Sequence, residues 1–136
     1  MAGAALLAVP AATGEEPLPG PIPAIVLRVV DGDTLEVRAR IWVAQDVTVL
    51  VRLDGIDTAE LRGACAEERA AAVAARAALT ELAAGQVVRL HDVRWDKYGG
   101  RVLARVTGAS GLDVGEALIA RAVARPYRGG PRSGWC

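Results

Sequence analysis

Three short clusters of polar residues in this 136-residue chain contain the side chains that could do chemistry. They are residues 31–34 (Asp-Gly-Asp-Thr), residues 52–60 (three carboxylates and one arginine) and residues 96–101 (Asp-Lys-Tyr-Gly-Gly-Arg). Read alone, each cluster is typical of an ordinary glycine-containing turn or of a solvated loop of ion pairs. Together they supply several carboxylates and two arginines, and no Ser–His or Cys–His arrangement competes with them.

This combination of side chains suits the hydrolysis of a phosphodiester. That reaction needs a water made nucleophilic, positive charge on the phosphoryl oxygens and help for the leaving oxygen. Aspartate and glutamate oxygens are suitable ligands for Ca²⁺ or Mg²⁺. A further glutamate can orient or deprotonate the attacking water, and two arginines can fork onto the phosphate. The three clusters therefore contain each type of group that the reaction requires.

Alternating apolar residues and turn residues predict the elements that position these clusters. The expected strands cover residues 25–30, 34–41, 47–53, 86–90 and 101–107. An alanine-rich helix is expected over residues 64–84, with Gly85 in its C-cap position. A second helix begins at Asp113, with Glu116 as its capping-box partner, and ends near Ala124.

The order of these elements predicts a mainly β, α+β fold. Five strands with a helix between the third and fourth, followed by a C-terminal helix, match the five-stranded OB-fold barrel. All three polar clusters then fall at strand ends or in adjoining loops.

The three clusters, in this order and with a helix between the second and third, resemble the staphylococcal-nuclease (thermonuclease) family. The similarity runs from about Val26 to Tyr127. It implies an OB barrel and a hydrolase that uses Ca²⁺ to cleave DNA and RNA. For the metal, the resemblance implies that Asp33 and Asp57 are carboxylate ligands and that Thr58 gives a main-chain carbonyl. Ala59 departs from the family, which usually has proline there.

The resemblance also implies which residues act on the substrate. Glu60 matches the glutamate that acts on the attacking water. Arg52 and Arg101 match the two arginines that hold the phosphate and stabilise the transition state. Tyr98 lies in a turn that matches the family's Asp-Lys-Tyr-Gly turn, and Tyr127 falls near tyrosines that flank the bound nucleotide, so both are expected to bind substrate. An extra glycine precedes the second arginine, although counting back along the following strand keeps that arginine at the expected place.

The first 23 residues differ from the rest and are interpreted as the remnant of a secretory signal peptide followed by a linker. Residues 24–136 then form one nuclease domain, and no apolar run approaches the ~20 residues of a membrane span. Two cysteines, Cys65 and Cys136, favour one disulfide in an exported small domain, with two unrelated free thiols as the alternative. We therefore expect a secreted or periplasmic monomer.

Composition leaves two other functions open. The 16 basic and 16 acidic residues cancel, which argues against a purely electrostatic binder of nucleic acid. From residue 117 onward there are four arginines and no acidic residue, so this tail is either a solvated surface or a phosphate-facing one. The alternatives to a nuclease are a non-catalytic OB-fold module that binds nucleic acid and an exported Ca²⁺-binding structural domain.

Overall fold

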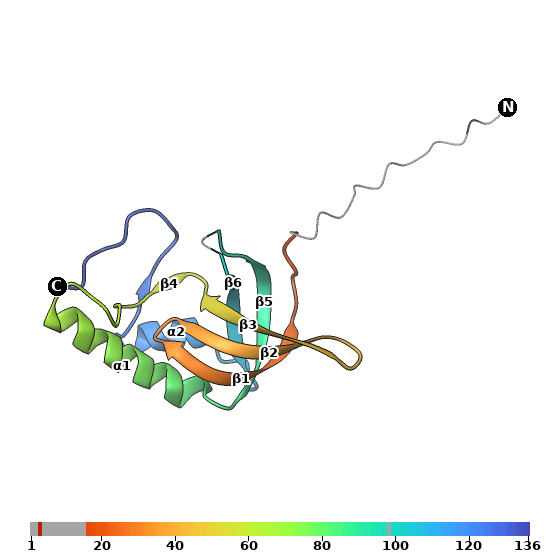
Figure 1. The fold of residues 1–136 in the computed structure, drawn as a ribbon, viewed down its shortest axis with the longest axis horizontal. Helices are drawn as coiled ribbons and strands as arrows, with labels where there is room; N and C mark the ends of the chain where they lie inside the picture. The colour runs from red at the N-terminus through yellow and green to blue at the C-terminus, as the bar shows by residue number, and fades with distance from the viewer. Residues whose placement is uncertain (1–2, 4–15, 98) are drawn as a thin grey trace.

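The computed structural model describes residues 3, 16–97 and 99–136. Most of the expected signal-peptide remnant and Tyr98 lie outside the described residues. Five strands form a closed barrel in the order β1-β2-β3-β6-β5 (Figure 1). The barrel strands are β1 (Ile22–Asp31), β2 (Thr34–Trp42), β3 (Gln45–Leu53), β5 (Val87–Trp95) and β6 (Arg101–Gly108).

Two helices and a small second sheet complete the fold. Helix α1 (Ala66–Ala83) lies in the chain between the third and fourth barrel strands, and α2 (Val114–Ala120) follows the last one. The short strands β4 (Ile56–Asp57) and β7 (Arg125–Pro126) pair with each other. The structure thus confirms the predicted α+β architecture, a mainly β, OB-like barrel with two helices.

The barrel interior follows the predicted alternation. Leu35, Val37 and Ala39 of β2 are buried, whereas the residues between them face outward. Helix α1 covers the barrel with a stripe of small side chains, and Leu79 is fully buried in it. Removing such apolar surface from water is the main favourable term in folding, so this core is what fixes the strand ends that carry the polar clusters.

Both helices are shorter than expected. Helix α1 begins at Ala66 because Cys65 is its N-cap, with Sγ accepting a hydrogen bond from the Glu68 amide at 3.3 Å. Helix α2 ends at Ala120, four residues before the expected end. Its chain reverses at Ala122, which has a left-handed φ of 59°. Alanine composition favours continued helix at both places, but capping and the turn into β7 override it.

The barrel strands are longer than expected, β1 and β5 by the most. β1 begins at Ile22, because its first residues pair with β5, with Ile22 opposite Leu90. β5 continues through an irregularity at Asp92, where φ is 53°, and ends at Trp95. Of the segment between the expected strands 86–90 and 101–107, only the short connection after Trp95 is therefore not strand. A bulge of this kind disrupts the simple alternation from which the strand end was predicted.

Strand register places the two predicted phosphate-binding arginines on one face. β3 and β6 run parallel, with Arg52 opposite Leu103 and Arg101 opposite Leu50. Because side chains alternate along a strand, Arg52 and Arg101 both point away from the barrel interior. On the other side of β3, the Leu53 amide donates to the Asp33 carbonyl at 2.8 Å, which brings the β1–β2 turn beside Arg52.

A disulfide joins the C-terminal residue to the start of α1. Cys65 and Cys136 are bonded, with a sequence separation of 71 residues and a Cα–Cα distance of 5.9 Å. Figure 1 shows the C-terminus beside the first turn of α1. The predicted disulfide is thus confirmed. Within the described residues, no helix has both the length and the apolar character needed to cross a membrane.

Replacing both cysteines by serine should lower the free energy of unfolding by about 4 kcal/mol, because the cross-link closes a long loop in the unfolded chain. Thermal and denaturant unfolding measure this change. Serine is a good N-cap, so Cys65→Ser keeps the helix cap and the loss reports the cross-link. Wild-type protein reduced with a dithiol is the matched comparison. An unchanged midpoint in both would contradict the prediction.

Candidate functional site

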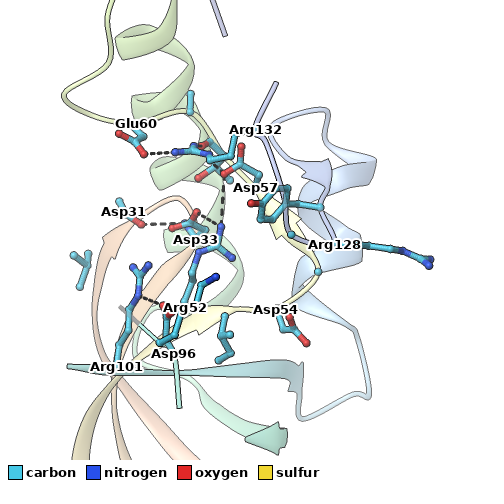
Figure 2. Close-up of a pocket in the computed structure, with 18 of the residues that line it drawn as sticks. Asp31, Asp33, Arg52, Asp54, Asp57, Glu60, Asp96, Arg101, Arg128 and Arg132 are labelled. Carbon is cyan, nitrogen blue, oxygen red and sulfur yellow. Dashed lines mark hydrogen bonds and ion pairs between the residues drawn. The ribbon is translucent and has the colours of Figure 1, made fainter. Parts of the chain in front are cut away.

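An open cleft with a volume of about 1290 Å³ brings the three polar clusters together (Figure 2). It lies over the β1–β2 turn, the end of β3, β4, the β5–β6 connection and the C-terminal tail. The charged lining residues among those described are Asp31, Asp33, Arg52, Asp54, Asp57, Glu60, Arg62, Arg94, Asp96, Lys97, Arg101, Arg128 and Arg132. Carboxylates and cations therefore alternate within one concave surface.

The β1–β2 turn presents Asp33 to this cleft. The Asp33 amide donates to Asp31 Oδ1 at 3.1 Å, and Thr34 Oγ1 donates to Asp33 Oδ1 at 3.0 Å. Only glycine fits at position 32, since a Cβ there would lie 2.6 Å from the Ala75 Cβ of α1. The turn is thus pressed against the helix, which fixes the direction of Asp33.

The pKa of Asp33 is raised to about 6. Burial is the largest cause, the hydrogen bond and negative charge of Asp31 add to it, and the positive charge of Arg52 opposes it. A cation placed beside Asp33 would offset the cost of burying its charge.

Asp57 is the most buried carboxylate of the second cluster, with 5% of its side chain exposed. The pairing of β4 with β7 holds it, and Asp57 lies opposite Arg125. Trp135 Nε1 donates to Asp57 Oδ2 at 3.4 Å. Among the described residues no group donates a well-aligned hydrogen bond to Oδ1, although Arg132 Nη2 is 2.8 Å away. The close positive charge of Arg132 therefore stabilises this buried oxygen.

Arg52 connects the first two clusters. Its Nη2 lies 3.4 Å from Asp33 Oδ2 and 3.6 Å from Asp57 Oδ1, and only 14% of its side chain is exposed. Nη1 donates to the Leu53 carbonyl at 3.1 Å, and the guanidinium carbon lies 5.9 Å from the centre of the Tyr127 ring. The side chain is therefore held on several sides within the cleft.

Arg101 comes from the third cluster and stands at the start of β6. Its Nε donates to Asp96 Oδ2 at 2.6 Å, and Asp96 is buried. The turn between them closes through the Asp96 amide bonded to the Arg101 carbonyl at 3.1 Å. Gly99 and Gly100 have φ of 79° and 73°, a left-handed conformation that glycine adopts readily, and both lie in the turn directly before Arg101. In Figure 2 the Arg101 and Arg52 side chains extend from neighbouring strands into the same cleft.

Glu60 lies at the rim of the cleft with 58% of its side chain exposed. Its loop contains Ala59, which is buried. Glu68 of α1 holds this loop, with Oε2 accepting from the Glu60 amide at 3.4 Å and Oε1 from the Ala64 amide at 3.0 Å. Helix α1 therefore restrains the loop that carries Glu60.

Arg132 is the residue of the site that sequence reasoning missed. Its Nη2 lies 2.8 Å from Asp57 Oδ1 and donates to the Thr58 carbonyl at 3.1 Å, and its Nη1 donates to Glu60 Oε1. Burial opposes its charge, but Asp57 and Glu60 together raise the pKa of its guanidinium above the ordinary value. The sequence does contain a signal for this role of Arg132. The segment after residue 117 is rich in arginine and free of acidic residues, and the expected disulfide of Cys136 returns it to Cys65, close to residues 57–60.

The structure brings nearly all predicted site residues into this one cleft. Those that line it are Asp33, Arg52, Asp57, Thr58, Glu60, Arg101 and Tyr127. The four arginines after residue 117 have different contacts. Arg121 pairs with Glu81 on α1, and Arg125 stacks on Trp135 at 3.6 Å. Arg128 and Arg132 line the cleft. Arg132 contacts carboxylates of the cleft, and 37% of its side chain is exposed.

The donor atoms fit a hard cation in kind. Asp33 and Asp57 each approach the same Arg52 nitrogen with a carboxylate oxygen, and the Thr58 carbonyl and Asp57 Oδ1 both contact Arg132 Nη2. Ca²⁺ prefers such oxygen donors and accepts water or substrate oxygens in the remaining positions. Within the described part of the chain there is no group of three His, Cys, Asp or Glu side chains placed to hold a metal. The candidate ligand set therefore consists of two carboxylates and one carbonyl, and the Arg132 guanidinium contacts Asp57 and Thr58 of this set.

No protein-family model matches this chain, and a search of curated proteins gives no significant match.

Proposed function

We propose that this protein is a calcium-dependent nuclease of the staphylococcal-nuclease kind, which hydrolyses phosphodiester bonds in DNA, RNA or both. The observation that carries the proposal is the convergence of Arg52 with Asp33 and Asp57. Two carboxylates of separate loops lie within 3.6 Å of one guanidinium nitrogen, in an open cleft. Carboxylate ligands for a cation and fixed arginine donors together suit the binding and cleavage of a nucleic-acid phosphate.

Arg52 and Arg101 would bind the phosphate that is cleaved. The two side chains come from adjacent parallel strands and share one face, so they approach a phosphate from neighbouring positions. Negative charge on the equatorial oxygens increases as the attacking oxygen adds to phosphorus. Donors that are already held in place stabilise that charge without having to reorganise, and this lowers the barrier.

Glu60 would act on the attacking water. Its carboxylate is at the rim of the cleft and is largely open to solvent, so a water can approach it. A carboxylate there can accept the proton of that water or orient it toward phosphorus. Asp33, Asp57 and the Thr58 carbonyl would hold Ca²⁺, and the bound ion supplies Lewis-acid stabilisation of the phosphoryl oxygens.

Two aromatic side chains suit the binding of a nucleic-acid strand. Tyr127 lies beside Arg52, and Trp95, at the end of β5, lines the same cleft with 56% of its surface exposed. Bases stack on such aromatic faces without strong sequence preference. Exposed Trp95 also suits the second candidate, an OB-fold module that binds strands without cutting them. The complete set of arginines and carboxylates favours the enzyme.

The disulfide supports an extracytoplasmic location as part of this proposal. Bonds of this kind persist in oxidising compartments and are rare in the cytosol. A secreted or periplasmic nuclease also operates where millimolar calcium is common, which suits an ion site with only a few protein ligands.

Incubation with a fluorescent single-stranded DNA oligonucleotide tests the proposal. We expect cleavage with Ca²⁺ and none after chelation, because the ion is needed on the phosphoryl oxygens. Gel electrophoresis of the products and a binding measurement on the same samples separate the candidates. Binding without cleavage at any calcium concentration would instead establish the binding module. Cleavage that survives chelation would exclude the calcium mechanism.

A further inference from the structure

The C-terminal tail, residues 128–136, is anchored at both ends and crosses the cleft between them. At one end β7 pairs with β4, and the Tyr127 amide donates to the Gly55 carbonyl at 2.9 Å. At the other end Cys136 is bonded to α1 through the disulfide. Trp135, packed on Arg125 at 3.6 Å, adds a second hold. The middle of the tail is therefore confined above the cleft.

Arg132 lies in this confined middle part and its guanidinium reaches the proposed cation ligands. It contacts one oxygen atom of each of three consecutive site groups: the Asp57 carboxylate, the Thr58 carbonyl and the Glu60 carboxylate. Two of these are the oxygens assigned to Ca²⁺ and the third belongs to the proposed base. Figure 2 shows Arg132 between Glu60 and Asp57.

We infer that the tail is an autoinhibitory segment in which Arg132 competes with Ca²⁺ for the Asp57 and Thr58 oxygens and covers Glu60. This inference rests on the proposed function, because it assigns a regulator to the same site. A Ca²⁺ ion and the Arg132 guanidinium would repel each other if both lay against the Asp57 and Thr58 oxygens, and Arg52 Nη2, 3.6 Å from the same Asp57 oxygen, adds to that repulsion. The cation therefore binds fully only when Arg132 has withdrawn.

The tail has the features of a segment that can withdraw. Gly129 and Gly130 precede Arg132 and have φ of 94° and 80°, and Gly134 follows it, so the backbone can change direction at these glycines, whereas Pro131 has a fixed φ. The Arg132 side chain is 37% exposed and Glu60 is more exposed still, so water can replace this part of the contact. The anchors at β7 and Cys136 remain in place, which keeps the guanidinium at high effective concentration when it does leave.

Calorimetric titration with CaCl₂ of the disulfide-bonded protein tests the inference directly. Arg132→Gln should bind Ca²⁺ about tenfold more tightly than wild type if the tail is bound nine-tenths of the time, since the apparent affinity scales with the open fraction. The matched control is Arg128→Gln, which removes the same charge from the same tail. Arg128 lines the cleft but points away from Asp57 in Figure 2, so its loss should leave the affinity near that of wild type.

A second variant tests whether the change in calcium affinity comes from the contacts of Arg132 and not from a general loosening of the tail. Arg132→Lys retains the charge but has a single ammonium in place of the planar fork, so it cannot contact all three oxygens as arginine does. We expect a calcium affinity between those of wild type and Arg132→Gln. Melting temperatures of all variants establish that each is folded.

The outcomes separate this inference from the proposed function. Equal and measurable calcium affinity in wild type and Arg132→Gln would overturn autoinhibition and leave the calcium-dependent nuclease standing. Weaker binding in Arg132→Gln would overturn it too, because Arg132 would then assist the ion. A raised KM for oligonucleotide with unchanged calcium affinity would make Arg132 a substrate-binding residue, which also overturns it. No calcium binding by any variant would overturn both proposals.

Discussion

Replacing Arg52 by lysine should lower turnover on single-stranded DNA by about a thousandfold at saturating calcium. Loss of one fixed donor that acts on transition-state charge costs about 3–4 kcal/mol, which corresponds to that factor. Lysine keeps a positive charge near Asp33 and Asp57, which Arg52 Nη2 approaches within 3.4 and 3.6 Å. It loses the planar pair of donors that matches a phosphate. Steady-state kinetics on a labelled oligonucleotide measure the change, with KM expected to move much less than turnover.

Arg94→Lys is the matched control for this variant. Arg94 also lines the cleft and also pairs with a carboxylate, donating to both oxygens of Asp54 at 3.0 Å. Its ion pair is with Asp54 rather than with Asp33 or Asp57. Its replacement should therefore leave turnover within a few-fold of wild type. Equal losses in both variants would show that the arginine donors of the cleft in general, and not Arg52 in particular, support the reaction.

Replacing Asp57 by asparagine should remove calcium-dependent cleavage almost completely, by about a thousandfold or more. Asn has the shape of Asp, but it lacks the charge that a hard cation requires, and several kcal/mol of Lewis-acid stabilisation are lost with the ion. Asp57 is 4% exposed and touches both Arg52 and Arg132. Oligonucleotide cleavage as a function of CaCl₂ concentration, together with calorimetric calcium binding, measures both consequences.

Asp54→Asn is the control, since Asp54 is a carboxylate of the same cluster that lines the same cleft three residues earlier. Its partner is Arg94 at the edge of the cleft, away from the proposed ion. We expect calcium affinity and turnover close to wild type. If Asp57→Asn retains wild-type calcium dependence while folded, Asp57 is not a ligand and the cation site must be sought elsewhere.

Local patterns in the sequence were sufficient for the barrel and for most of the cleft. The alternation at Leu35, Val37, Ala39 and Ile41 predicts a strand with one buried face. The structure buries the first three, but Ile41, near the end of β2, is 54% exposed. The Asp113 cap starts α2 as expected, accepting a hydrogen bond from the Glu116 amide at 3.0 Å. Such features depend on neighbours within a few residues, so they can be predicted without knowledge of the fold.

The ends of elements were predicted less well. The β5 strand continues past an irregularity at Asp92, and α2 stops where Ala122 adopts a left-handed conformation. In both places tertiary contacts override a weak local preference. β5 is held by its pairing with β6, and the chain after α2 must turn to reach β4.

The arrangement of the site itself was decided by tertiary structure. The parallel register of β3 and β6 sets Arg52 and Arg101 on one face, and no local pattern specifies which residues of two distant strands lie opposite each other. Arg132 reaches Asp57 and Glu60 across more than 70 positions of the sequence because a disulfide and a two-residue sheet return the tail to the cleft. Residue types and spacing determine which groups are present, since these are local properties. Which charges meet depends on long-range packing, because only the folded chain brings segments far apart in sequence within a few ångströms.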